Sequence, residues 1–527
     1  MTNQGNIDYV KGQDRDQLIL FPGSIEEYID EDDAVRVVDQ FVDSLNLAEL
    51  GFKHFEPKDL GGRPAYDPYD LLKLFLYGYL NGIRSSRKLA RECKRNVEIM
   101  WLLRKLTPDF RTISDFRKIN VDSIKKVFRE FVELCKSLDL IGGELVGIDG
   151  VKLKAVNSNG RNFSKAKLEY RIKRLDLHIA EYLRQLQEND KDSSSGVKNQ
   201  QQTAPASSEG GVDQSNSNSV PCSSSSSSPS DIVTQHARDE IKKLESKKIE
   251  YANLLIKLKQ TGQSQISLTD PDRRAMKNNR KIEPCYNAHV SVDSKFHLIP
   301  EYHVTNEPVD HSWLSFVAKS TKAALGVERL DVTADIGFFN IQTMKDCLDN
   351  GIVPYIPEFT SYRKDGSGVP SRDFRRDNFV YDEIGDRFVC PVGRELLFRT
   401  WGTDRHGRRM KLYWTNNNAC SLCPFRNKCT TNRSRGRTIE RWEYEDVAED
   451  LRRMRKSEKG LAAIEKRKEL CEHPFGTIKR AFNQGYVLLK GVRKVNGEFG
   501  LTMLTYNLKR AINLLGAKNL VLAIKKV

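Results

Sequence analysis

The stretch that decides the fold is 144–155, which reads ELVGIDGVKLKA. Its apolar run, residues 145–148, is typical of a buried strand and ends at Asp149. From residue 151 to residue 155, apolar residues alternate with lysines, which is the pattern of a second, half-exposed strand. A carboxylate at the end of a buried strand is costly unless a cation or hydrogen-bond donors compensate it. Asp149 is therefore a candidate functional residue.

Two more acidic residues occur in settings of this kind. The sequence RLDVTADIG at 329–337 is a second apolar run, and it ends at Asp335. The sequence RKELCEHPFGTIKR at 467–480 is helix-like and carries Glu472, followed by Lys479 in an E-x6-K spacing. Acids brought together from distant segments are a common device for holding a pair of Mg²⁺ ions that promote phosphodiester cleavage. The pattern favours a metal-dependent nucleic-acid enzyme.

Composition agrees with that interpretation. The chain has 527 residues, 39% of them hydrophobic, so it is long enough to bury several cores. Its net charge of +15 suits a polyanionic partner, although charge alone fits equally well a protein that is merely basic. No apolar run approaches the ~18 to 20 residues that span a bilayer, and the N-terminus lacks the apolar core of a signal peptide. We therefore expect a soluble, cytosolic protein, in which ten thinly spread cysteines are reduced thiols.

The segment up to about residue 139 carries strong helix signals. Asp67 followed by Pro68 is typical of a helix start, and the apolar stretch 71–80 follows it. Further helices are predicted at about 85–95, 112–118 and 124–138. The pattern fits a helix-turn-helix relative that contacts phosphates, and it fits equally a helical dimerisation or packing domain.

An insertion interrupts the strand pattern after residue 162. Two charged helical stretches, at about 164–187 and 237–259, flank a tract rich in Ser, Gln, Asn and Gly. We predict an antiparallel helical hairpin whose tip, about 190–232, is too polar to fold. The hairpin is either an arm that grips DNA or a second subunit, or a tolerated surface insertion.

After the insertion the strand pattern resumes. Residues 286–292 and 297–304 read as a hairpin, a helix follows at about 312–325, then the strand that ends at Asp335, a further helix and the strand 352–356. The order strand, strand, strand, helix, strand, helix, strand matches the ribonuclease H-like α/β topology. In that topology the strands that carry Asp149 and Asp335 are neighbours, so the two carboxylates can share a metal.

A cysteine set lies between Asp335 and Glu472. The spacing C-x2-C-x5-C is preceded by the sequence VCPVG, and four thiolates in such turns suit tetrahedral structural zinc. Reduced structural thiols are the alternative. The candidate zinc ligands are Cys390, Cys420, Cys423 and Cys429, whereas Cys93, Cys135, Cys347 and Cys471 fall on apolar faces typical of core residues.

Basic and aromatic residues interleave in the same segment, as in surfaces that bind nucleic acid. A solvated basic surface explains them equally well. They are Arg372, Arg375, Arg376, Arg433, Arg435, Arg437, Arg452, Arg453 and Arg455, with Trp401, Trp414 and Trp442.

Taken together, these motifs resemble a DDE transposase of a bacterial insertion sequence, of the group with an InsH-like helical N-terminal domain. The resemblance spans nearly the whole chain, and the motifs occur in the family's order. They are RPAYDPYDLLKLFLYGYLNGIRSSRKLARECKRNVEIMWL, TISDFRK, IDGVKLKA, SLTDPDRRAMK, YNAHVSVD, ADIGFFN, CSLCPFRNKC, EHPFGTIKR and LTYNLKR.

The resemblance implies a catalytic triad of Asp149, Asp335 and Glu472 that binds two Mg²⁺ (or Mn²⁺) ions, with Lys479 as the lysine of the family's Y-R-E-K signature. Many relatives have tyrosine and arginine where this chain has Glu465 and Lys468. The resemblance therefore does not imply, for this chain, the DNA contacts that the tyrosine and the arginine make in those relatives. We expect DNA contacts from Lys479, Lys468, Arg480, Arg87 and Arg91.

The resemblance also implies an organisation for the whole chain. We expect a helical DNA-binding or dimerisation domain at 1–140, a ribonuclease H-like core with a mixed sheet at 141–162 and 266–360, the hairpin insertion at 163–265, the Cys/Arg-rich insertion at 361–445 and C-terminal helices that carry the catalytic Glu at 446–527.

The implied function is that of a homodimeric transposase that binds the terminal inverted repeats of its element in double-stranded DNA, cleaves them and transfers the strands, in the cytoplasm and associated with the nucleoid. Two alternatives stay open: an inactive or domesticated DNA-binding relative, and a ribonuclease H-like nuclease without strand transfer.

Overall fold

The computed structural model describes residues 23–53, 65–156, 162–195, 229–262, 265–278, 281–357, 370–403, 409–415, 417–432 and 436–526. The chain forms two compact units. One consists of residues 1–155 and 274–527, and the other of residues 156–273. In the described segments, no helix combines the length and the apolar character that crossing a membrane requires.

The N-terminal region is helical, as predicted. Asp67 caps the second helix by accepting a hydrogen bond from the backbone N–H of Tyr69, and Pro68 occupies the first turn. The apolar residues that follow are buried, which explains why this segment forms a helix inside a module. The elements are η1 (Ile25–Tyr28), α1 (Ala34–Asp43), α2 (Pro68–Leu80), α3 (Ser86–Glu92), α4 (Val97–Leu102), α5 (Phe110–Ile119) and α6 (Val121–Ser137).

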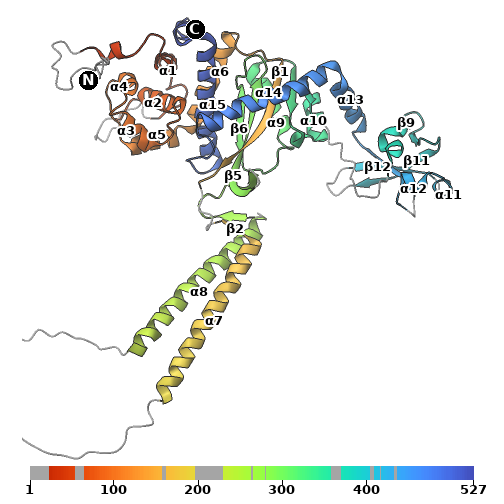
Figure 1. Ribbon diagram of the computed structural model, residues 1–527, viewed down its shortest axis with the longest axis horizontal. Coiled ribbons are helices and arrows are strands. Elements are labelled where there is room, and N and C mark those ends of the chain that lie inside the picture. The colour runs from red at the N-terminus through yellow and green to blue at the C-terminus, as the bar shows by residue number, and fades with distance from the viewer. Residues whose placement is uncertain are drawn as a thin grey trace, which may run out of the picture. The chain divides into compact units, whose positions relative to one another are not determined.

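A mixed sheet forms the centre of the same unit (Figure 1). The central strand β1 pairs antiparallel with β5 and parallel with β7, and β7 pairs parallel with β8. The order is β4-β5-β1-β7-β8, with β6 also paired to β5. The strands are β1 (Leu145–Lys154), β4 (Arg274–Asn278), β5 (Lys281–Asp293), β6 (Glu301–Thr305), β7 (Leu330–Ala334) and β8 (Ile352–Tyr355).

One prediction about these strands is wrong. The stretches 145–149 and 151–155 were expected to be two strands, but residues 145–154 form the single strand β1. Its pairing with β5 runs without a break from Val146 to Lys154, because Gly150 stays extended and pairs with His289. With β1 counted once, four strands of this sheet (β1, β4, β5 and β6) precede α9, one more than expected, and β7, α10 and β8 follow in the expected order.

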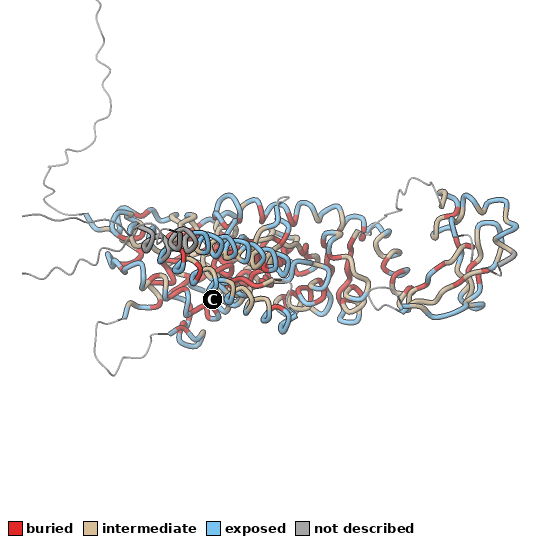
Figure 2. Tube along the Cα trace, turned by 90° about the horizontal axis from the view of Figure 1, so that it is seen from below, coloured by how far each residue is buried: buried red, intermediate tan, exposed pale blue. Residues whose placement is uncertain are grey.

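Helices cover the sheet, and burial is concentrated in the strands and the helix faces that contact them (Figure 2). Helix α14 packs against β1, β5, β7 and β8. Helix α15 packs against α2 and α6, so the C-terminal segment contacts the N-terminal helices. The covering helices are α9 (Leu314–Leu325), α10 (Ile341–Asp349), α13 (Glu445–Lys456), α14 (Glu458–Arg480), α15 (Val492–Leu515) and α16 (Ala517–Ile524).

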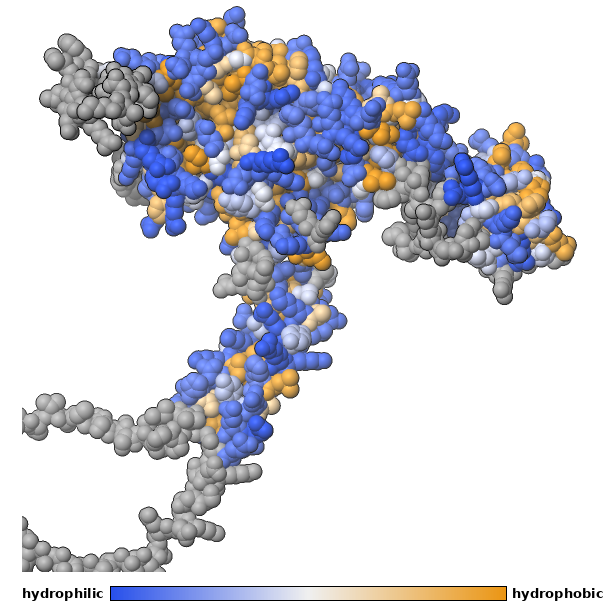
Figure 3. Space-filling view, viewed as in Figure 1, coloured by the Kyte–Doolittle hydropathy of each residue, from blue (hydrophilic) through white to orange (hydrophobic). Residues whose placement is uncertain are grey.

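The second unit is the predicted antiparallel hairpin. It consists of α7 (Lys165–Ser195) and α8 (Pro229–Thr261), with the short strands β2 (Asn162–Ser164) and β3 (Gln265–Ser267) paired at its base. A hydrogen bond from Arg171 to the Tyr251 hydroxyl (3.0 Å) joins the two helices. Their surface is largely hydrophilic with apolar patches (Figure 3). Both helices extend into the range 190–232 that was expected to be the tip, and the rest of that range, 196–228, lies outside the described residues.

The Cys/Arg-rich segment contains a five-stranded antiparallel sheet of order β13-β12-β11-β10-β9, which the sequence did not predict. It has a small core of its own, made of Phe379, Phe388, Leu396, Tyr413 and Ile439. The elements are η5 (Arg372–Phe374), η6 (Arg376–Asn378), β9 (Val380–Asp382), β10 (Arg387–Val389), β11 (Glu395–Thr403), β12 (Arg409–Trp414), α11 (Asn417–Ser421), α12 (Arg426–Cys429) and β13 (Thr438–Trp442).

Candidate active site

Asp149 and Asp335 occupy equivalent places on neighbouring parallel strands. In the register of β1 and β7, Ile148 pairs with Ala334, and each of the two acids is the next residue. Asp149 is half-buried and accepts a hydrogen bond from the backbone N–H of Gly150 (2.7 Å). Asp335 is exposed and caps η4 (Ile336–Phe338) by accepting from the N–H of Ile336 (2.6 Å). The predicted adjacency of these two strands is therefore confirmed.

Glu472 approaches the same place from α14. Side chains alternate along a strand, and the Cα of Gly147 faces Leu470 and Cys471 of α14, so Asp149 also lies on the α14 face of the sheet. Burial raises the pKa of the Cys471 thiol, and the charges of Asp149, Asp335 and Glu472 raise it further. Glu472 is the residue next to Cys471 in the chain, so the electrostatic contributions that depend on the fold are those of Asp149 and Asp335, and they support the proximity of these two acids to this part of α14.

The site carries an excess of negative charge. Burial raises the pKa of Asp149 to about 6, and the neighbouring charges of Asp335 and Asp310 also raise it, while the Gly150 N–H and Arg467 lower it. Hard carboxylate oxygens and uncompensated negative charge suit Mg²⁺ or Mn²⁺. The donor chemistry thus fits such ions. In the described part of the chain, however, no three His, Cys, Asp or Glu side chains are already arranged as the ligands of one ion.

Arg467 is a site residue that sequence reasoning missed. It is half-buried on α14, one turn before Cys471, and its charge acts on both Asp149 and Cys471. The available signal was its spacing, because residues four apart share a helix face and Cys471 lies on the apolar face. An arginine on the face that covers an acidic site offsets part of its charge.

The raised pKa of Asp149 gives a prediction about stability. The ordinary value is 3.8 and the folded value is about 6, so the folded protein holds this proton more tightly than the unfolded chain. The stabilising contribution of Asp149 to the free energy of unfolding is fully present below pH ~4. It is lost as the pH rises through ~6, a change of about 3 kcal/mol. Asp149→Asn should therefore raise the melting temperature of the metal-free protein at pH 7.5, in EDTA, and change it little near pH 4.

Asp346 on α10 provides the control for this measurement. Hydrogen bonds from Lys319 and Ser315 lower its pKa, so Asp346→Asn should lower the melting temperature at pH 7.5. A lower melting temperature for Asp149→Asn at pH 7.5 would show that Asp149 is not destabilising in the metal-free protein.

The residues expected to contact DNA all lie on the surface. Lys468, Lys479 and Arg480 are exposed on α14, and residues 468, 472 and 479 share one face of that helix because residues four and seven apart lie in line. Arg87 and Arg91 are exposed on α3. The five residues therefore form two groups on two separate helices.

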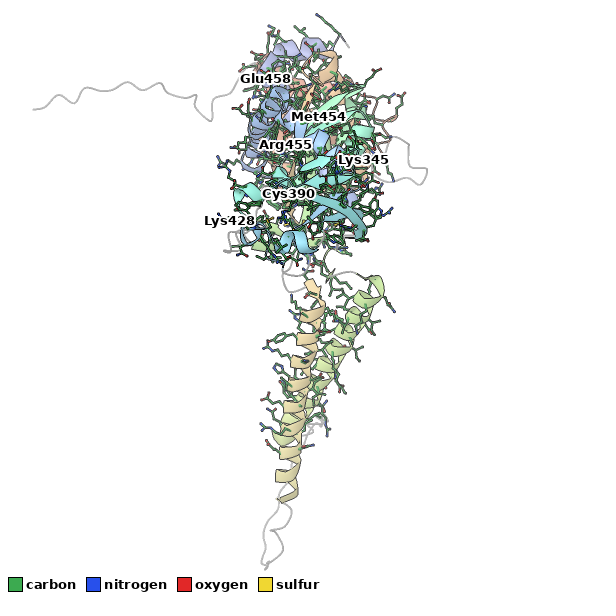
Figure 4. The ribbon with its side chains drawn as sticks, turned by 90° about the vertical axis from the view of Figure 1, so that its right-hand side faces the viewer. Lys345, Cys390, Lys428, Met454, Arg455 and Glu458 are labelled. Carbon is green, nitrogen blue, oxygen red and sulfur yellow. The ribbon has the colours of Figure 1, made fainter. Side chains whose placement is uncertain are left out.

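The four candidate zinc ligands surround one small cavity of about 30 Å³, together with apolar side chains such as Phe374 and Phe379. Cys390 follows β10, and Cys429 ends α12 next to Lys428 (Figure 4). Burial raises the pKa of the Cys429 thiol to about 11, so it is protonated at neutral pH. Because no group of three such side chains among the described residues is arranged to hold a metal, structural zinc is not supported. Cys93, Cys135, Cys347 and Cys471 are buried, as predicted.

Some arginines of this segment form ion pairs within the protein. Arg376 (2.9 Å) and Arg452 (3.0 Å) both pair with the buried carboxylate of Glu445. Trp401 is 43% exposed on β11, and the Arg409 guanidinium lies 4.7 Å from its ring centre. Arg433 and Arg435 lie outside the described residues.

Two family models match the chain. Residues 23–119 match a transposase domain (DUF772), and residues 389–512 match a transposase DDE domain. The first range covers the N-terminal helices through α5, and the second covers β11–β13 and α13–α14 with Glu472. Asp149 and Asp335 lie outside both ranges. No curated protein and no solved structure matches the chain.

These two matches confirm the resemblance found in the motifs. Two segments of the chain are similar to transposase domains, which is consistent with a DDE transposase of an insertion sequence. Domains of the DDE kind generally use divalent metal ions.

Proposed function

We propose that this protein is the transposase of an insertion sequence, which binds the terminal inverted repeats of its element, cleaves a phosphodiester bond at each end and joins the freed ends to target DNA. The single observation that carries the proposal is the parallel pairing of β1 and β7, because it brings Asp149, within β1, next to Asp335, directly after β7, on strands that the helix bearing Glu472 packs against. The two matching transposase domains agree with it.

The proposed catalytic fold is ribonuclease H-like. Its support is the sheet order β4-β5-β1-β7-β8, with β6 also paired to β5, and the chain order β1, β4, β5, β6, α9, β7, α10, β8. On this reading the helical hairpin and the five-stranded module are the two insertions, which interrupt the core after β1 and after β8.

Asp149, Asp335 and Glu472 are the residues that would hold Mg²⁺ or Mn²⁺. Such ions, when bound, activate the attacking oxygen and stabilise the leaving oxygen of the phosphodiester. The chain's own contribution is position: two rigid parallel strands fix the aspartates, and α14 supplies the glutamate. Arg467 moderates the repulsion between the acids, and Lys468 and Lys479, on the Glu472 face of α14, offer charges to the phosphates on either side of the scissile bond.

The DNA is expected to contact more than the active site. Arg87 and Arg91 on α3 present exposed charges that suit phosphates, and the net charge of +15 favours association with DNA. Holding two element ends for strand transfer requires two active sites, so we propose a homodimer. It would act on DNA in the cytoplasm, in association with the nucleoid.

The test uses labelled DNA that carries the gene's own flanking sequences. Purified protein should bind these ends in preference to scrambled DNA, and should nick them at the element boundary in Mg²⁺ or Mn²⁺ but not in EDTA. Joining of the nicked ends to a target plasmid distinguishes a transposase from a nuclease that only hydrolyses. Binding without nicking in either metal would instead favour an inactive end-binding relative, and the absence of inverted repeats beside the gene would contradict the proposal altogether.

A further inference from the structure

A polar cluster lies on the face of the sheet opposite α14. Gly150 and Lys152 of β1 share this face, since Gly147 and Asp149 point towards α14. In the register of the antiparallel pair, Gly150 lies opposite His289 and Lys152 opposite Asn287, so these four residues are on one face. Asn287 and His289 are fully buried.

Asp310 completes this cluster from the segment 306–313, which joins β6 to α9. Its Oδ1 accepts hydrogen bonds from Asn287 Nδ2 (2.6 Å) and from Lys152 Nζ (3.1 Å). Asn287 Nδ2 also lies within hydrogen-bond distance of the Glu307 carbonyl (3.2 Å). Hydrogen bonds thus hold the segment 306–313 against both β1 and β5, close to Asp149.

The cluster also contacts the residue after Asp149 and a side chain of the turn that follows Asp335. A Cβ at Gly150, the residue after Asp149, would lie only 3.1 Å from Asp310 Oδ1, so the carboxylate rests against the strand itself. The His289 ring packs edge-on against Phe338, with 5.7 Å between ring centres, and Phe338 ends the turn η4 that Asp335 caps. Trp313 stacks on the His289 ring, with 5.5 Å between ring centres.

Stability alone is a poor explanation for this cluster. Asn287 Oδ1 and His289 Nδ1 are buried and have no hydrogen-bond partner among the described residues, which costs free energy. Well-packed apolar side chains often stabilise such a position as well as buried charged groups do, or better. Metal-dependent chemistry, by contrast, needs its ligands held within about 0.5 Å, and a network behind them is the usual device.

We propose that Lys152, Asn287, His289 and Asp310 form a back-face clamp, which positions Asp149 and Asp335 relative to each other by fixing the backbone of Gly150 and the turn η4. The inference rests on the proposed function, because it assigns these residues to the positioning of the metal-binding acids. They are positioning residues and do not touch the DNA.

The test compares Asp310→Ala with Asp310→Asn and with Asp346→Ala. Asp346 is the matched control, since it is an aspartate of the same α/β core, on α10, that accepts hydrogen bonds from Ser315 and Lys319, both on α9. Two quantities are compared: the binding of Mn²⁺ to the protein alone, by electron paramagnetic resonance, with Asp149→Asn as the reference for loss of the site, and the rate of nicking of bound ends. The Kd for DNA ends is measured as well, as a check that the DNA surface is unchanged.

Asp310→Ala should weaken Mn²⁺ binding at least tenfold and slow nicking at least 100-fold, while the Kd for DNA ends stays within twofold. Asp310→Asn should recover Mn²⁺ binding to within threefold of the unmodified protein, because its amide oxygen still accepts from Asn287. Asp346→Ala should change neither quantity. If Asp310→Ala does not fold, Lys152→Met, which keeps the aliphatic stem, replaces it with the same expectation.

The clamp is overturned if Asp310→Ala binds Mn²⁺ and nicks DNA as Asp346→Ala does. Its failure can be told from failure of the proposed function. If the unmodified protein nicks its ends and Asp310→Ala nicks them equally fast, the function stands and the clamp fails. If the unmodified protein binds Mn²⁺ through Asp149 yet does not nick its ends, the function fails, and the Mn²⁺ measurement alone decides for or against the clamp.

Discussion

Asp335→Asn is expected to reduce nicking of the element ends by about 10³-fold or more and to leave the binding of those ends within twofold. The change removes one negative charge from the acidic site and keeps the size of the side chain. Asp335 is exposed, and an asparagine can still cap η4 through its amide oxygen, so the fold should be preserved. Nicking is measured on pre-bound, end-labelled DNA in Mg²⁺, with the melting temperature as a check on folding.

Asp349→Asn is the matched control, because Asp349 is an exposed aspartate at the end of the next helix, α10, where it pairs with Lys345. It should nick DNA at the normal rate. Asp335→Cys adds a test of metal ligation: a thiolate is a softer ligand than a carboxylate, so activity should return in Mn²⁺ more than in Mg²⁺. Normal nicking by Asp335→Asn in Mg²⁺ would remove Asp335 from the proposed site.

Arg84→Met is expected to lower the free energy of unfolding by about 3 to 5 kcal/mol, the usual effect of breaking a buried ion pair on one side. The Arg84 guanidinium lies 2.7 Å from Glu498 Oε1, and both side chains are almost completely buried. It also donates to the carbonyls of Asn483 and Tyr486. Because Arg84 follows α2 and Glu498 lies in α15, the substitution leaves a buried carboxylate at the contact between the N-terminal helices and the C-terminal helix.

The loss is measured as the shift in the urea or thermal unfolding transition of the compact unit that contains α2 and α15. Arg493→Met is the control, since Arg493 also joins α15 to the N-terminal helices, through Asp122 of α6, but this pair is exposed. Such surface pairs contribute at most about 1 kcal/mol. Adding Glu498→Gln to Arg84→Met should recover part of the loss. Equal effects of Arg84→Met and Arg493→Met would show that burial does not govern the strength of this contact.

Local pattern predicted most elements of the core, because burial of one helix face or one strand face imposes a period on the sequence. This pattern predicted the helical N-terminal region, the β5–β6 hairpin, the helical hairpin of α7 and α8, and the strand that ends before Asp335. The same reasoning divided β1 at Gly150, since a glycine after an acid resembles a turn, and only the pairing with β5 shows that the strand continues. The five-stranded module escaped prediction because β9 and β10 have only three residues each and the longer β11 is mostly exposed, so none of the three shows a clear buried face in the sequence.

The sequence by itself indicated three candidate acids, the apolar runs that precede Asp149 and Asp335, the helix that carries Glu472, and the basic character of the chain, because these properties are local or additive. Only the tertiary structure decided that β1 and β7 pair in parallel, that α14 carries Arg467 over the acidic site, and that Asp310 reaches the back of Gly150. These are contacts between segments far apart in the chain. They depend on which surfaces pack together, and the periodicity of one segment does not specify which other segment it will contact.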